Sequence, residues 1–253
     1  MDINDFQEDM LNVFYERTQY DKIKISIVLC ENIYECALKY SPCEKHKKML
    51  LTNKESIQIL NGLSFPKSIL DDGYFAIISK KIFNYKDNTF LGTYMHEITH
   101  AHDFDVFAKY INATTTEDIY NSMYYDTAMG IISEFNARKN GFSYVREKSY
   151  CFFNLEEESD YILSKEIPYV ISKSGNLEDI YSLTQLFGRM AVFDSKTKER
   201  ARYCFYEFLS KIFNQHTYDN ITKMYEILYK FQGEKNNINF CLPEIHSIMN
   251  SLF

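Results

Sequence analysis

Half of the histidines in this chain of 253 residues lie in one short segment. The segment "HEITHAH", residues 96–102, contains three of the six. His96 and His100 are four residues apart, so on a helix their imidazoles lie on one face, one turn apart, and can bind one metal ion at about 2.0–2.1 Å each. Glu97 lies about 100° further round the helix, where it can reach a water molecule at that metal. This HExxH pattern predicts two metal ligands and a general base.

A catalytic zinc site needs a third protein ligand and an open position for water. A third histidine at the spacing of the longer HExxHxxGxxH pattern is missing, so we expect a carboxylate. The segment "MGIISEFNARKNG" places small residues and one carboxylate on one helix face, namely Gly130, Glu134, Ala137 and Gly141. Small residues let another helix come close, which predicts Glu134 as the third ligand. The alternative is that Glu134 pairs with Arg138, four residues on, at a solvated surface.

Three further residues near this motif are candidates for the site. Asp103 follows His100 by three residues on the same helix face. It could bind the metal directly, accept a hydrogen bond from a ligand imidazole and fix its tautomer, or lie at the surface. Tyr144 and Arg138, near the end of the Glu134 helix, are candidates for stabilising an oxyanion. His102 points off the ligand face and is predicted to be a surface or packing residue.

The pattern of apolar residues predicts the elements that must position this site. Helices are expected at 4–18 and 30–41, and strands at 23–28, 55–60 and 74–79. For 55–60 a helix fits the pattern nearly as well as a strand. A helix from Asn88 or Thr89 to about Tyr110 carries the histidines. A capping box of Thr114 and Glu117 starts the next helix, which is expected to end near Asn140 with Gly141 as its C-cap.

After Phe142 the strand patterns nearly vanish and amphipathic helices follow, one of them interrupted or kinked at Pro168. We therefore predict an α+β, predominantly α fold with a core at 1–145 and a helical region at 146–253 packed on it. In "LEDIYSLTQLFGRMAVF", residues 177–193, an apolar face with small residues should pack on the HExxH helix or on a neighbouring C-terminal helix. This face comprises Leu177, Ile180, Tyr181, Thr184, Phe187, Gly188 and Ala191.

Charge, apolar runs and cysteine spacing disfavour several classes of protein. The net charge of −7 and a pI near 5.5 disfavour a nucleic-acid-binding surface. The N-terminal segment "MDINDFQEDM" has no pattern of a secretory signal, and the apolar runs are too short to span a bilayer. The six cysteines show no CxxC spacing and read as free thiols. We therefore expect a cytoplasmic protein with no membrane and no nucleic-acid partner.

The motif residues resemble a known family. "HEITH", followed 34 residues after His100 by Glu134, resembles the gluzincin arrangement of the zincin metallopeptidases. "EFNAR" is similar to the third-ligand helix of the ImmA/IrrE family, small intracellular zincin-like proteins that are often encoded on phages and integrative elements. The resemblance covers about residues 1–142. Thr99 stands where the family usually has Gly, and Asn136-Ala137 reverses the family's Ala-Asn.

The resemblance implies a minimal zincin core that binds one Zn²⁺ per chain through His96, His100 and Glu134. It implies hydrolysis of a peptide bond in a peptide or protein substrate, with Glu97 as general base. The strand at 74–79 could pair with an extended substrate. The alternative is a non-catalytic zinc-binding regulatory protein that recognises a protein partner. The sequence leaves the oligomeric state open.

Overall fold

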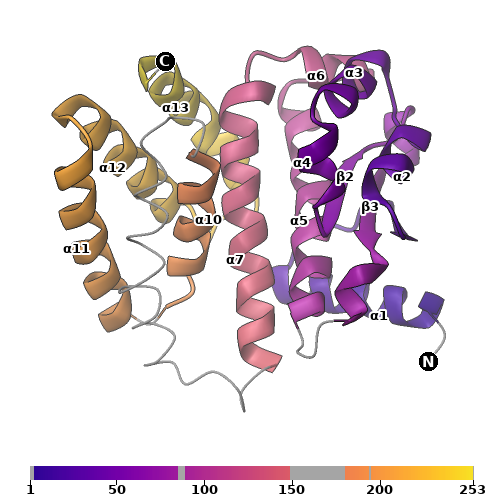
Figure 1. Ribbon diagram of the computed structural model, residues 1–253, viewed down its shortest axis with the longest axis horizontal. Helices are drawn as coiled ribbons and strands as arrows, with labels where there is room; N and C mark the ends of the chain where they lie inside the picture. The colour runs from indigo at the N-terminus through magenta and orange to yellow at the C-terminus, as the bar shows by residue number, and fades with distance from the viewer. Residues whose placement is uncertain (1–2, 85–88, 149–179, 194, 253) are drawn as a thin grey trace. The chain divides into compact units, whose positions relative to one another are not determined.

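The computed structural model describes residues 3–84, 89–148, 180–193 and 195–252, and its chain divides into two compact units, Met1–Tyr125 and Asp126–Phe253 (Figure 1). The fold is α+β and predominantly α, as predicted. The predicted domain limits, 1–145 and 146–253, stay a prediction. Of the helices that the structure describes, none combines the length and the hydropathy that a bilayer crossing requires.

The N-terminal unit contains a three-stranded sheet and the helices around it. Its strands are β1 (Ile25–Cys30), β2 (Gly62–Pro66) and β3 (Tyr74–Ser79). Its helices are α1 (Ile3–Thr18), α2 (Ile33–Lys39), α3 (Glu44–Thr52), α4 (Lys54–Gln58), α5 (Thr89–Tyr110) and α6 (Thr116–Asn121). Short 3₁₀ turns lie at Leu70–Asp72 and Lys80–Asn84. The strand order is β1-β3-β2, with β3 parallel to β1 and antiparallel to β2.

Most of the predicted elements of this unit are present. The strand at 74–79 and the helix at 89–110 have the predicted limits, while Asn88 lies outside the described residues. The predicted strand at 55–60 is wrong, because this stretch contains α4 and the strand that follows begins only at Gly62. In a strand, Ile57 and Ile59 would share one face. Ile57 is instead buried while Ile59 is 82% exposed, as a helical turn allows.

Helices pack on both faces of the sheet, so the central strand β3 is almost entirely buried. On one face, Phe65 and Ile77 pack with side chains of α2, α3 and α4, namely Ile33, Tyr34, Ala37, Leu50 and Ile57. The other face lies against α5. There Ser64 of β2 stands opposite Ala76 of β3, and Gly62 lies two residues before Ser64. Small side chains on this face let α5 approach the sheet closely.

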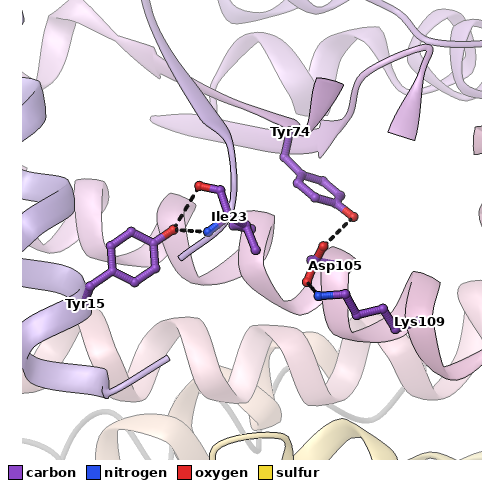
Figure 2. A network of polar contacts seen from close by, with 5 residues as sticks. All are labelled: Tyr15, Ile23, Tyr74, Asp105 and Lys109. Carbon is purple, nitrogen blue, oxygen red and sulfur yellow. Dashed lines mark hydrogen bonds and ion pairs between the residues drawn. The ribbon is translucent and has the colours of Figure 1, made fainter. Parts of the chain in front are cut away.

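A polar network fixes the C-terminal half of α5 on the sheet (Figure 2). The hydroxyl of Tyr74, at the start of β3, donates to Asp105 of α5 at 3.3 Å, and Asp105 pairs with Lys109 at 2.6 Å. Burial, and then the nearby Asp105 carboxylate, raise the pKa of Tyr74, so its phenol stays protonated as a donor. On α1, the hydroxyl of Tyr15 donates to Ile23 O at 3.3 Å and accepts from Ile23 N at 3.1 Å. The Tyr74–Asp105 bond thus joins the helix of the HExxH motif to β3, while the Tyr15 bonds join α1 to the segment before β1.

The single helix predicted from Thr114 to about Asn140 is wrong. The stretch forms α6, a π-helical turn at Tyr125–Met129 and α7 (Gly130–Lys148). The capping box is one residue later than predicted, because Thr115 and Asp118 bond reciprocally. Because Thr115 is the N-cap, Thr114 lies outside the helix, and its N–H donates to Asp118 at 2.8 Å. Gly141 is not a C-cap, since α7 continues through it to Lys148.

The described part of the C-terminal unit is helical. Besides α7 it contains α10 (Ile180–Met190), α11 (Ser195–Ile212), α12 (Gln215–Lys230) and α13 (Asn237–Leu252) (Figure 1). Two buried amides join α7 to α13: Asn136 donates to Asn237 at 2.9 Å and accepts from it at 2.7 Å. Two predictions fall outside the described residues. One is the helix near 155–174 with its interruption at Pro168, and the other is the place of Leu177 on the apolar face.

The predicted inward packing of the α10 face is confirmed within this unit. Thr184 and Phe187 are fully buried, and the Phe187 ring contacts Tyr225 of α12 at a centroid distance of 4.7 Å. At Gly188 the helix lies directly on α7, since a Cβ there would be 2.7 Å from the carbonyl oxygen of Phe135. The expectation that the C-terminal region packs on the HExxH helix stays a prediction.

Candidate metal centre

The two histidines of the motif converge on one point beside α5. The Nε2 atoms of His96 and His100 are 2.9 Å apart, and the two rings are nearly perpendicular at 86°. Two nitrogens bound tetrahedrally to one zinc ion would be about 3.3 Å apart, given bonds of about 2.0–2.1 Å. The predicted pairing of the imidazoles on one helix face is therefore confirmed, with a separation close to that of a shared ion.

Glu134 of α7 completes a possible metal-binding group with the two histidines. One ligand atom of each residue lies within 4.8 Å of the other two. Among the described residues, Asp103 does not belong to this group. Two imidazole nitrogens and one carboxylate oxygen are a donor set that zinc takes in catalytic sites. The residues present thus fit a divalent metal of this kind.

Glu134 also forms the ion pair with Arg138 that the alternative interpretation predicts. Arg138 Nε lies 3.0 Å from Glu134 Oε1, as the spacing of four residues allows. The surroundings differ from the solvated surface considered above, because the Glu134 side chain is only 12% exposed while that of Arg138 is 42% exposed. A carboxylate has two oxygens with several lone pairs, so it can accept from Arg138 through one and bind a metal through the other.

Glu97 is buried and lies against the strand β2. It is 4% exposed, and the Ser64 hydroxyl lies 2.8 Å from its Oε2 and 2.9 Å from its main-chain oxygen. A Cβ at Gly62 would come within 2.4 Å of Glu97 Oε1. Neither Ser64 nor Gly62 was predicted from sequence. The one available signal was that "GLS" places two small residues on the same face of a strand.

The remaining predicted site residues lie as follows. Asp103 is buried, at 2% exposure, and its role as ligand or hydrogen-bond partner of a ligand stays a prediction. His102 is a packing residue, as expected, because it is buried and stacks on Tyr20 with ring centroids 4.2 Å apart. Tyr144 is buried in α7, ten residues after Glu134, which is about 15 Å along a helix. The oxyanion roles of Tyr144 and Arg138 stay predictions.

The prediction that the strand at 74–79 pairs with an extended substrate is wrong. This strand is β3, which is bonded to β1 on one side and to β2 on the other. A strand paired on both sides has no main-chain groups left for a further strand. In the sheet formed by the described residues, the edge strand nearest to Glu97 is β2.

No protein-family model, curated protein or solved structure matches this chain. The resemblance to the zincin metallopeptidases therefore rests on the motif residues alone and stays a prediction.

Proposed function

We propose that this protein is a zinc-dependent peptidase of the zincin type, similar to the ImmA/IrrE proteins, in which His96, His100 and Glu134 hold the metal. The observation that carries the proposal is the arrangement on α5. The Nε2 atoms of His96 and His100 lie 2.9 Å apart. Glu97, which directly follows His96, has a buried carboxylate that is bonded to Ser64 of the sheet. A buried carboxylate that directly follows a metal ligand in the chain is suited to the role of general base.

When bound, zinc would supply Lewis acidity, which polarises a carbonyl and lowers the pKa of a coordinated water towards 7. Glu97 would take a proton from the attacking water as the new C–O bond forms. It would then return that proton to the nitrogen as the peptide C–N bond breaks. Burial favours this role, because water around a carboxylate would otherwise compete for its lone pairs.

The proposed substrate is a peptide or a protein segment in extended conformation. The edge strand β2 supports this proposal, because its outer main-chain groups could pair with such a segment next to Glu97. The negative net charge and the free thiols of the described cysteines favour a cytoplasmic protein whose partner is not a nucleic acid.

The test compares wild type, Glu97→Gln and the control Glu55→Gln, an exposed glutamate on α4 of the same unit. Each purified protein is analysed for zinc and incubated with a mixture of defined peptides, and the products are identified by mass spectrometry. We expect Glu97→Gln to keep its zinc and melting temperature but to lose about 100-fold or more in cleavage rate. Glu55→Gln should behave as wild type.

Two results would contradict the proposal. Wild-type cleavage by Glu97→Gln would show that the base lies elsewhere. A wild-type protein that binds zinc and cleaves none of the peptides would instead favour the alternative, a zinc-binding regulatory protein.

A further inference from the structure

We propose that Ser64 and Gly62 of β2 are positioning residues for Glu97, Ser64 by holding its carboxylate and Gly62 by leaving room for it. The inference rests on the proposed function, because it assigns Glu97 the role of general base. Both residues lie on the strand face that meets α5, two positions apart, as the period of a strand requires.

Ser64 fixes the direction in which the Glu97 side chain points. Its hydroxyl has one proton and lies within bonding distance of two Glu97 oxygens, Oε2 at 2.8 Å and the main-chain oxygen at 2.9 Å. One hydroxyl group thus contacts both the carboxylate and the main chain of Glu97. Ser64 is itself buried at 7% exposure, so solvent offers little replacement for this bond.

Gly62 leaves the space that the carboxylate occupies. A Cβ at this position would lie 2.4 Å from Oε1 and 2.5 Å from both Cδ and Cγ of Glu97. Carbon and oxygen atoms do not approach so closely, so any side chain at position 62 must displace the end of Glu97. The displaced group is the flexible one, because the backbone of β2 is held by its ladder.

The strand that carries both residues has a fixed position. Gly62 pairs with Ile78 and Ser64 with Ala76 in the antiparallel ladder with β3. On the opposite face, Phe65 is 1% exposed and packs in the core beneath the sheet. A group that is placed by a paired strand is held more closely than one placed by a loop, which is what a general base requires.

The experiment uses the zinc-loaded full chain with Ser64→Ala, Ser64→Thr and Gly62→Ala, and with Ser26→Ala on β1 as control. The probe is the peptide that wild type cleaves fastest in the defined mixture. We expect Ser64→Ala and Gly62→Ala to keep KM within about twofold and one zinc per chain, while kcat falls about 10- to 100-fold. Ser64→Thr retains the hydroxyl and should restore kcat, whereas a purely structural role predicts lost stability without such rescue.

A second readout does not depend on activity. In crystal structures of the zinc-loaded proteins, we expect the Glu97 carboxylate to lie on β2 in wild type and Ser64→Thr, and to move off it in Gly62→Ala and Ser64→Ala. If wild type cleaves no peptide, the proposed function fails, yet these structures still test the positioning. Wild-type kcat in both variants, or an unmoved Glu97 side chain in both, would overturn the inference.

Discussion

Acidification should destabilise the protein through His46, a buried histidine on α3. It is 1% exposed, its Nδ1 lies 3.0 Å from the hydroxyl of Ser41, and its ring packs on Phe65 and Tyr120 at centroid distances of 4.6 and 5.3 Å. Burial in these surroundings lowers the pKa of His46 from 6.5 to about 4. Phe65 belongs to β2, so His46 supports the strand that holds Glu97.

The sign and size of the effect follow from this pKa difference. The unfolded chain binds the proton more tightly than the folded one, so the free energy of unfolding is unaffected above about pH 7 and falls as the pH drops from 6.5 to 4. Linkage then gives a loss of about 2 kcal/mol between pH 7 and pH 5, rising to about 3 kcal/mol at pH 4. Below pH 4 the contribution of His46 levels off.

Urea unfolding followed by circular dichroism at pH 7 and pH 5 measures this loss. A chelator in all samples removes any contribution from metal release. His46→Gln cannot titrate, so we expect its stability to fall by about 2 kcal/mol less than that of wild type over this interval. Ser41→Ala, the control, loses a hydrogen bond but keeps the imidazole, and should retain the pH dependence. Equal pH dependence in wild type and His46→Gln would refute the reasoning.

Two further predictions concern the packing of the C-terminal unit, and urea unfolding measures both. Gly188→Ala places a methyl group 2.7 Å from a carbonyl oxygen of α7 and should lower the free energy of unfolding by about 1–3 kcal/mol, whereas unchanged stability would contradict the close contact of α7 and α10. Asn136→Ala leaves the buried amide of Asn237 without its partner and should cost about 1–3 kcal/mol. Changing both Asn136 and Asn237 to leucine removes both amides, so it should lower the free energy of unfolding less than Asn136→Ala does. A larger loss in the double variant would contradict the pairing of the two amides.

The helix of the HExxH motif and the pairing of its histidines could be predicted because their signals are local. A spacing of four residues decides which side chains share a helix face, whatever packs on it. The strand at 74–79 was equally clear, since a Gly turn precedes a run of apolar and β-branched residues. Glu134 could be singled out as the one carboxylate on a face of small residues.

The environment of Glu97 could not be predicted, because it depends on contacts distant in the sequence. Ser64 and Glu97 are 33 residues apart, and only the register of β2 on β3 brings them together. The strand β2 itself is five residues long and contains Gly and Pro, so its pattern is weak. The break between α6 and α7 was missed because a π-helical turn has no comparable sequence signal.

The metal content of the purified protein tests the central claim most directly. Inductively coupled plasma mass spectrometry of the full chain should find one zinc ion per wild-type chain. His100→Ala and Glu134→Ala each remove one of the three ligands and should lose nearly all of it. The control His216→Ala, which removes an exposed imidazole on α12, should keep it. Full retention of zinc in His100→Ala would contradict the metal centre and the peptidase proposed on it.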